Sequence, residues 1–214
     1  MPSAAIVFAS VRVTPTERLQ SRLARFVEPF VVAADDGATT ALEFGLPPDV
    51  VVGDLDSVQA STLARLEGVP IEEYPRDKNA TDGQLAIERA LQVRPTELIL
   101  IGYLGGPRLD QALANVLLAT LVDTPVVILD ERNEATLLRP GAGHVWRPEA
   151  GEVVSLIPLA GDVQGVHTQG LKWPLRGETL RFGDTRGVSN EPIADEAHVS
   201  IDSGLLLVTR HFPL

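Results

Sequence analysis

The segment DVVVGDLDS, residues 49–57, is the most distinctive local feature of the sequence and indicates a buried strand. It opens with a run of valines, which is typical of a buried strand, and closes with a glycine and two aspartates that end the run. If the strand persists, the side chains of Asp54 and Asp56 point the same way while Leu55 turns into the core, because side chains alternate along a strand. Two such carboxylates suit one hard cation. The spacing is equally compatible with a polar connection in which Asp56 or Ser57 caps the following helix.

Other strand-like runs alternate with helical patterns on both sides of this stretch, up to about residue 135. Such alternation predicts βαβ units and therefore a parallel sheet. The expected helices begin near residues 14, 61, 81 and 110. The expected strands are residues 6–9, 30–34, 49–53, 97–102 and 125–130.

Capping boxes mark the start of two of these helices. Thr14 opens the first, with Pro15 at the first helical position, and this helix is expected to run to about Phe26. Thr81 and Gln84 form the second box. These signals predict where the chain turns from loop into helix.

The pattern changes from about Gly141 onward. Short apolar runs are separated by Gly, Pro and Asp, and no helical periodicity is present. This favours an antiparallel β-sandwich or barrel. The expected fold is therefore α/β, with an N-terminal Rossmann-like parallel-sheet domain over residues 1–138 and an all-β domain over residues 139–214.

Composition narrows the function. The 214 residues are 44% hydrophobic and include no cysteine, which excludes disulfides and thiolate chemistry and favours a cytoplasmic protein. Residues 1–13 lack the basic segment of a signal peptide, and no apolar run is long enough to span a bilayer. The net charge of −11 argues against a nucleic-acid partner, and the lack of a spanning apolar run argues against a membrane partner. An acidic protein binds a triphosphate when divalent cations bridge its carboxylates to the phosphates, so the charge points to magnesium.

The ends of the expected strands locate the site. In open α/β sheets, ligands bind beyond the carboxyl ends of the strands, at a switch in strand order. Three of these ends deliver acidic or glycine-rich loops to that edge, which suits metal and phosphate. The residues concerned are Asp35 and Asp36, then Asp54 and Asp56, then Gly105, Gly106 and Arg108.

Most of the remaining features have a simple structural explanation when taken singly. Asp82 and Asp110 are acceptable as first-turn helix residues, and Asp110 is the expected cap of a helix carrying Leu113, Leu117 and Leu121. An arginine at 108 matches phosphate bidentately, but GGPR is also a common turn. Trp173 is either core or, if exposed, able to stack on a flat cationic heterocycle.

Taken in order, these fragments resemble the thiamine pyrophosphokinase family. The likeness spans most of the chain and both halves, and its collinearity is more specific than any single motif. The segments that carry it are residues 34–38, 48–57, 77–82, 105–115, 170–175 and 189–190.

The resemblance implies transfer of pyrophosphate from ATP to the hydroxyl of thiamine, giving thiamine diphosphate and AMP. It implies Mg²⁺ held by Asp54, Asp56 and Asp82, with Arg108 and Asp110 around the triphosphate and the hydroxyl. It also implies a homodimer whose thiamine pockets form between the subunits. The implied ATP-binding residues are Asp35, Gly37, Ser57, Lys78, Thr81, Gly105, Gly106 and Arg108. The implied thiamine-binding residues are Asp110, Gln111, Asn115, Trp173, Ser189 and Asn190.

The sequence departs from the family pattern at several positions and leaves two alternatives open. Asp36 replaces a glycine, and Pro107 is an extra residue before the arginine. Asn79 replaces an aspartate, Gln84 a glutamate and Gln111 a histidine, so a charge or a titratable ring is lost at these three positions. One alternative is a pyrophosphokinase for another acceptor, such as a pterin alcohol. The other is a module that binds thiamine or nucleotide without catalysis. The segment 170–175 favours thiamine, and the retained aspartates favour an enzyme.

Overall fold

The computed structural model describes residues 4–54, 58–74, 77 and 79–213. The chain forms two compact units, Met1–Glu131 and Arg132–Leu214. This division lies before the boundary expected after residue 138. The reason is that β7 (Asn133–Leu138) pairs along its length with β13 (Leu206–His211), which ties it to the second unit.

The first unit contains a parallel sheet in the order β4-β3-β2-β1-β5-β6. The predicted parallel sheet is thereby confirmed. Its strands are β1 (Ala4–Phe8), β2 (Phe30–Ala34), β3 (Val50–Val52), β4 (Ile71–Glu72), β5 (Glu97–Ile101) and β6 (Val126–Leu129). Its helices are α1 (Glu17–Leu23), α2 (Gly37–Glu43), α3 (Ala60–Arg65), α4 (Asp82–Leu91), α5 (Leu109–Leu118) and the short η1 (Ala119–Leu121).

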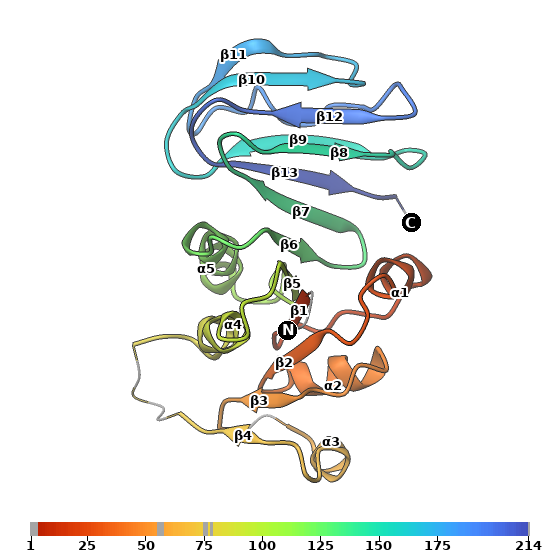
Figure 1. Ribbon diagram of the computed structural model, residues 1–214, viewed down its shortest axis with the longest axis vertical. Helices are drawn as coiled ribbons and strands as arrows, with labels where there is room; N and C mark the ends of the chain where they lie inside the picture. The colour runs from red at the N-terminus through yellow and green to blue at the C-terminus, as the bar shows by residue number, and fades with distance from the viewer. Residues whose placement is uncertain (1–3, 55–57, 75–76, 78, 214) are drawn as a thin grey trace. The chain divides into compact units, whose positions relative to one another are not determined.

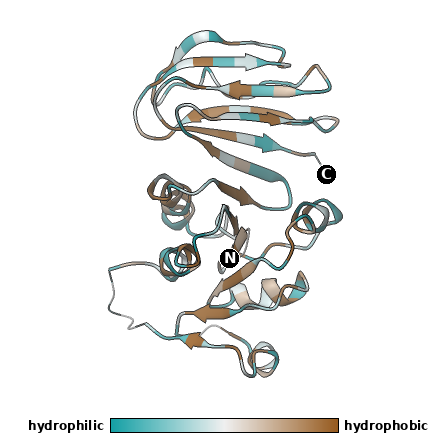
Figure 2. Cartoon of the chain, viewed as in Figure 1, coloured by the Kyte–Doolittle hydropathy of each residue, from teal (hydrophilic) through white to brown (hydrophobic). Residues whose placement is uncertain are grey.

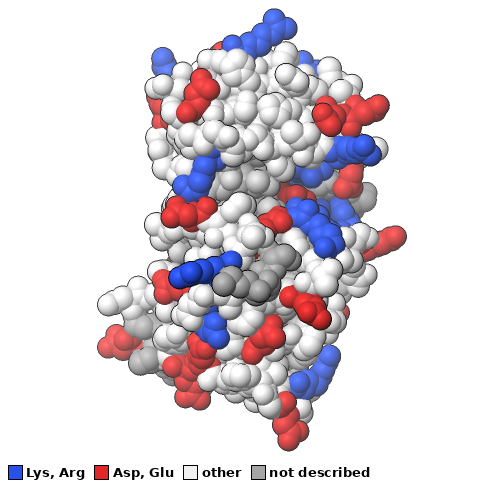
Figure 3. All heavy atoms as spheres, in the orientation of Figure 1, with Lys and Arg blue, Asp and Glu red and all other residues white. Residues whose placement is uncertain are grey.

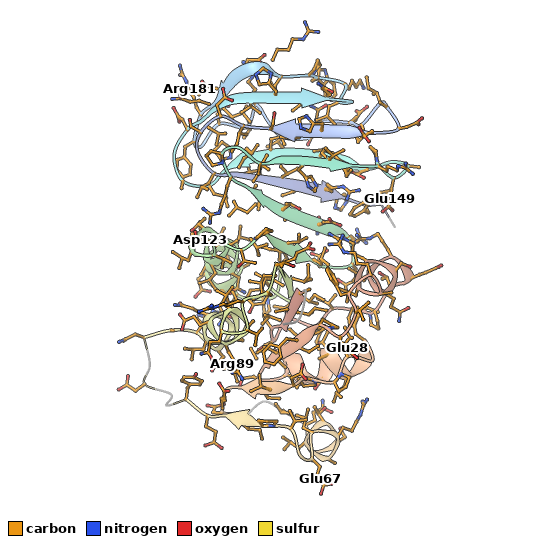
Figure 4. All side chains as sticks on the ribbon, viewed as in Figure 1. Glu28, Glu67, Arg89, Asp123, Glu149 and Arg181 are labelled. Atoms are coloured by element: carbon orange, nitrogen blue, oxygen red, sulfur yellow. The ribbon has the colours of Figure 1, made fainter. Side chains whose placement is uncertain are left out.

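Helices lie on both faces of this sheet, as Figure 1 shows for α4 and α5 on one side of the strands and α1 and α2 on the other. The central strands are apolar along their whole length (Figure 2), because a strand covered on both faces needs apolar side chains at every position. Arg89, labelled in Figure 4, ties α4 to β4 by donating to Glu72 at 2.7 Å. Among the described residues, no helix is both long and apolar enough to cross a membrane.

The helix starts follow the sequence signals only in part. Thr16, rather than Thr14, caps α1 by accepting a hydrogen bond from the Leu19 amide at 3.3 Å, and the helix ends at Leu23. Thr81 caps α4 as predicted and accepts a hydrogen bond from the Gln84 backbone amide at 3.2 Å. The Gln84 side-chain nitrogen donates to Glu88 Oε1 at 2.9 Å instead of completing the box. At α5 the cap position belongs to Arg108, and Asp110 lies in the first turn.

The second unit is built from two antiparallel sheets, in the orders β7-β13-β9 and β11-β10-β12-β8. The predicted antiparallel β region is confirmed. Residues 202–204, an Asp-Ser-Gly stretch between two apolar runs that favours a hairpin, instead join β12 to β13, which lie in different sheets. The remaining strands are β8 (Gly143–Trp146), β9 (Val153–Pro158), β10 (Val163–Gln169), β11 (Arg176–Leu180) and β12 (Ala197–Ser200).

A buried ionic network lies in this second unit. The Arg210 guanidinium donates to both carboxylate oxygens of Glu152 at 2.8 Å and lies 3.7 Å from a carboxylate oxygen of Glu134, and all three residues are buried. The Trp146 indole N–H also donates to Glu152, at 2.8 Å. Burial lowers the pKa of Arg210, but the hydrogen bonds and charge of Glu152 more than offset this, so its pKa lies above the usual value and it stays charged.

Surface charges are arranged differently. Acidic and basic side chains are interspersed over the face drawn in Figure 3, and exposed pairs such as Arg12 with Glu43 recur along the chain. Such pairs contribute little to stability, since solvent screens them. The buried network is therefore the place where a single charge matters for folding.

Replacing Arg210 with methionine is expected to lower the free energy of unfolding by about 3–5 kcal/mol, because two buried carboxylates lose their cation. Urea unfolding followed by circular dichroism measures this. Arg181→Met, at an exposed position labelled in Figure 4, is the matched control and should change stability by less than about 0.5 kcal/mol. A loss below about 1 kcal/mol for Arg210→Met would show that the network does not carry the predicted energy.

Candidate functional site

The strand order of the first unit reverses between β1 and β5, so the loops after these two strands flank the switch point. A Cβ added to Gly102, directly after β5, would lie 2.5 Å from the carbonyl oxygen of Val11, after β1. A Cβ on Gly106 would lie 3.0 Å from the Val11 side chain. Both glycines have positive φ, at 79° and 85°. The glycine-rich turn therefore lies close against the loop after β1.

The ends of β2 and β3 also meet at this edge. Asp35 follows β2 with a left-handed backbone, φ 46°, and donates its amide N–H to the Val52 carbonyl at 3.0 Å. Its carboxylate lies where a side chain on Gly53 would be, so Asp35 is directly beside the residue that precedes Asp54. A Cβ on Gly37 would lie 2.2 Å from a β1 carbonyl, so glycine is required there. Asp36 has an ordinary helical backbone, φ −66°, and does not need to be glycine.

The start of α4 is joined to the loop after β5. The Tyr103 hydroxyl is fully buried and donates to the Gly83 carbonyl at 2.8 Å. Burial raises the pKa of Tyr103 well above its usual range, so it remains a neutral donor. Asp82 immediately precedes Gly83, and Thr81 caps the same helix. This bond fixes the first turn of α4, with its carboxylate, against the switch-point loop.

The predicted metal ligands are described only in part. Asp54 is exposed and Asp82 half-buried, while Asp56 lies outside the described residues, as do Ser57 and Lys78. Carboxylate oxygens are the donors that Mg²⁺ prefers, so the chemistry of the set fits this ion. Among the residues that the structure describes, no three His, Cys, Asp or Glu side chains are grouped closely enough to hold a metal.

Arg108 and Asp110 form an exposed bidentate pair. The guanidinium donates to the two carboxylate oxygens at 2.9 and 2.5 Å. The hydrogen bonds from Arg108 lower the pKa of Asp110 to about 2, and the same bonds raise the pKa of Arg108. A carboxylate with so low a pKa is a poor proton acceptor at neutral pH, because efficient bases titrate near the working pH. The pair instead fixes the orientation of Arg108. Gln111 and Asn115 follow on the same helix, exposed and half-buried respectively.

A polar cavity of about 440 Å³ lies in the same unit, and its lining includes Asp36. Its two arginines are already engaged. Arg12 pairs with Glu43 at 2.5 Å, and Arg65 donates to the Leu42 carbonyl at 3.4 Å. Its lining carries charges of both signs, so the cavity by itself does not select an anion.

The second unit has its own cavity, of about 440 Å³, which contains three of the predicted residues. The Trp173 side chain is 53% exposed, so it is not part of the core and presents aromatic surface to a ligand. Arg186, at the rim, is held near Glu178 at 3.5 Å. The lining is Leu156, Trp173, Pro174, Leu175, Arg186, Gly187, Val188, Ser189 and Asn190.

Asn190 is largely engaged with backbone groups. Its side-chain oxygen accepts from the Trp173 amide at 3.1 Å and from the Glu191 amide at 2.9 Å, and its side-chain nitrogen donates to the Trp173 carbonyl at 2.8 Å. Its own backbone pairs with Val154 on β9. The residue is 8% exposed. Asn190 therefore holds the Trp173 segment in place, and it also lines the cavity.

Ser189 is in a left-handed conformation, φ 63°, which is unfavourable for a side chain other than glycine, asparagine or aspartate. Its amide donates to the Ser155 hydroxyl at 3.1 Å, which helps to fix this conformation. Strained backbone of this kind is frequent at ligand sites.

Three residues that contribute to these sites were not singled out from the sequence. Tyr103 fixes the start of α4, while Lys172 and Glu191 flank Trp173. A tyrosine directly after a buried strand is a weak signal, and the pairing of residues 172 and 191 has no local signal at all.

Asn190→Asp is expected to loosen Trp173, because a carboxylate oxygen would replace the nitrogen that donates to the Trp173 carbonyl. The free energy of unfolding should fall by about 1–3 kcal/mol. ¹⁹F NMR of protein labelled with fluorotryptophan should show the Trp173 signal shift or broaden while that of buried Trp146 stays unchanged. The matched control is Asn133→Asp on β7. An unchanged Trp173 signal in Asn190→Asp would contradict the positioning role.

Comparison with known proteins identifies the family. Residues 26–128 match the family model described as thiamin pyrophosphokinase, catalytic domain, and residues 144–206 match that of the thiamin pyrophosphokinase vitamin B1 binding domain. The curated thiamine pyrophosphokinase of Bacillus subtilis (strain 168) is 30% identical over 184 residues, covering 84% of this chain and 86% of the relative.

Solved structures agree with this. The crystal structure of thiamin pyrophosphokinase from Geobacillus thermodenitrificans has a TM-score of 0.82 and 28% identity, with 98% of each chain covered. That of the Bacillus subtilis enzyme, at 24% identity, shows the shared fold, with a TM-score of 0.87 over 99% of this chain and 100% of the other. The parallel sheet, the antiparallel second unit and both sequence matches together show that the chain belongs to the thiamine pyrophosphokinase family, a family of transferases.

Proposed function

We propose that this chain transfers a pyrophosphoryl group from magnesium-bound ATP to the hydroxyl of thiamine in the cytoplasm, releasing thiamine diphosphate and AMP. The family supports pyrophosphate transfer to thiamine. The observation that carries the finer proposal is the convergence at one sheet edge of a glycine-rich turn, Asp35 beside the loop of Asp54, and the fixed first turn of α4 with Asp82.

The triphosphate is proposed to lie along this edge. Gly105 and Gly106 allow the backbone to approach phosphate oxygens closely, since neither carries a side chain. Gly37, which packs against the Phe8 carbonyl at the start of α2, is proposed to border the triphosphate together with Asp35 and Thr81. The resemblance adds Ser57 and Lys78, which lie outside the described residues.

Asp54, Asp56 and Asp82 would hold Mg²⁺, which supplies charge neutralisation at the phosphates when bound. Without an aspartate at position 79, fewer protein charges than in the family pattern surround the ion. The hydrogen bond from the Tyr103 hydroxyl to the Gly83 carbonyl fixes the backbone that carries the Asp82 carboxylate.

Arg108 is proposed to stabilise the charge that develops on the transferred group, since its fork matches phosphate oxygens. Asp110 accepts two hydrogen bonds from the Arg108 guanidinium group. Transfer of this kind depends mainly on positioning and charge stabilisation, so a strong general base at the hydroxyl is not required. Asp110, Gln111 and Asn115 are proposed to orient the thiamine hydroxyl.

The cavity of the second unit is proposed to take the thiamine rings. Its lining combines apolar surface from Leu156 and Leu175 with the exposed indole of Trp173, which suits a flat cationic heterocycle. Ser189 and Asn190 both line this cavity, and Asn190 also holds the Trp173 backbone.

A homodimer is also part of this proposal, and α5 supports it. No residue of this ten-residue helix is buried, and Leu109, Leu113 and Leu117, spaced four apart on one face, are 73%, 58% and 49% exposed. Leu121, just beyond the helix, is 73% exposed. An apolar stripe of this kind typically marks an interface, and a two-fold axis would pair it with its own copy.

Purified chain mixed with ATP, Mg²⁺ and thiamine should form equal amounts of AMP and thiamine diphosphate. Chromatography and mass spectrometry measure both products. Asp54→Asn should lower kcat by at least about a hundredfold, because the phosphates lose a neutralising charge partner. The matched control is Asp123→Asn, which precedes β6 and so lies beyond the amino end of that strand (Figure 4). Folded protein that forms no AMP with any of several divalent metals would refute the proposal.

In the same assay, Asp110→Asn distinguishes an orienting carboxylate from a general base. We expect a loss of about tenfold or less, because Arg108 and the amide of the variant remain. Loss of a general base costs about 10²–10⁴-fold. A loss in that range, with a pH profile that loses one ionisation, would assign proton transfer to Asp110 instead.

The double variant Leu113→Glu, Leu117→Glu should convert a dimer to a monomer, because four like charges would face each other across the two-fold axis. Light scattering after size-exclusion chromatography measures the change from the mass of two chains to that of one. Leu63→Glu, at a partly exposed leucine on α3, is the control and should remain dimeric. A monomeric wild type, or a dimeric double variant, would remove α5 from the interface.

A further inference from the structure

The segment that carries Trp173 is paired with a second segment, residues 190–193, over several consecutive bonds. The Lys172 amide donates to the Glu191 carbonyl at 2.8 Å, and the Ile193 amide donates to the Gly170 carbonyl at 2.8 Å. The Asn190 side chain adds its two bonds to the Trp173 backbone between them. The backbone that carries the indole is therefore fixed by the paired segment.

The indole ring of Trp173 already has a cation next to it, the ammonium group of Lys172. The Lys172 ammonium lies 4.7 Å from the centroid of the Trp173 ring and donates to a carboxylate oxygen of Glu191 at 2.8 Å. Lys172 does not line the cavity, whereas Trp173 does. The ammonium is thus held against the ring from outside the cavity, by an acid on the paired segment.

This arrangement changes what the ring offers to a ligand. An aromatic face attracts a cation through its π electrons, and a second cation at the same ring is repelled by the first. A neutral heterocycle of the same shape is not repelled. Since the Lys172 side chain is 47% exposed, solvent screens the repulsion and the effect is modest.

Granting the thiamine site proposed above, on which this step rests, we propose that Lys172, held by Glu191, is a specificity-determining residue that weakens the hold of Trp173 on the cationic thiazolium ring. The heterocycle is unchanged by the transfer, so its attraction to Trp173 holds substrate and product equally and does not lower the barrier. Weakening that attraction lets the product leave while the contacts at the reacting hydroxyl are kept.

The test compares two ligands on the full-length chain by titration calorimetry: thiamine, and its uncharged analogue in which a thiophene replaces the thiazolium. The readout is the ratio of the two dissociation constants. Lys172→Met keeps most of the apolar stem and removes the charge. It should shift the ratio about two- to fivefold in favour of thiamine.

Two further variants separate the local effect from net charge. The double variant Lys172→Met, Glu191→Gln keeps the net charge of the wild type and should still favour thiamine, because the ring has lost its ammonium. Arg181→Met removes one positive charge elsewhere in the same unit, at an exposed position labelled in Figure 4, and should leave the ratio unchanged. Thermal unfolding of each variant shows whether the fold is kept.

The outcomes are distinguishable. If Lys172 only pins the indole, Lys172→Met weakens both ligands alike and the ratio stays constant, which overturns the inference. A ratio that shifts away from thiamine overturns it as well. A wild-type chain that binds no thiamine, with or without a nonhydrolysable ATP analogue, refutes the proposed function itself. A shifted ratio in both lysine variants, with none in Arg181→Met, supports the assignment.

Discussion

The parallel pairing of β1 with β5 is the constraint on which the first unit depends. These strands are hydrogen-bonded to each other in the sheet although three other strands separate them in the chain. From β1 the strand order continues to β2, β3 and β4 on one side, and from β5 to β6 on the other. Because every strand is parallel, all the loops that follow the strands emerge at one edge. The glycine-rich turn, the aspartates and the first turn of α4 owe their common location to this one topological fact. The residue types at these positions can be read from short sequence segments, but their closeness in space depends on the strand order of the whole sheet.

The two units fix their functional side chains by different physical means. In the first unit, close backbone packing at Gly37, Gly102 and Gly106 brings loops together, and a buried tyrosine anchors a helix start. In the second unit, the side-chain amide of Asn190 hydrogen-bonds to both the backbone N–H and the carbonyl of Trp173, as a neighbouring strand would. An exposed aromatic residue gains a defined orientation in this way without being buried. Rigid support behind an accessible side chain lowers the entropy lost when a ligand binds.

Charge has three separate roles in this chain. The buried Arg210 network belongs to folding, because an unpaired charge there has no access to solvent. The Arg108–Asp110 pair is exposed, so its attraction is screened and its bonds are open to exchange for those of a phosphate. The Lys172–Glu191 pair lies against an aromatic ring, where it modifies the attraction of that ring for other cations. Exposure, rather than the residue types, separates these roles.

Local patterns in the sequence were enough to predict the parallel first unit, the antiparallel second unit and the family, because strand and helix periodicity are local and the motifs occur in a fixed order. They also predicted that Asp35 and Asp54 follow strands that end at one edge of the sheet, whereas Asp82 was predicted from the family resemblance. Only the tertiary structure decided that the chain divides before β7, because strand pairing with β13 outweighs proximity in sequence. It likewise decided that Asn190 supports Trp173, that Asp110 is bound by Arg108, and that Lys172 lies on the indole. Each of these depends on which backbone groups are left to be satisfied once distant segments pack together, and no window of sequence contains that information.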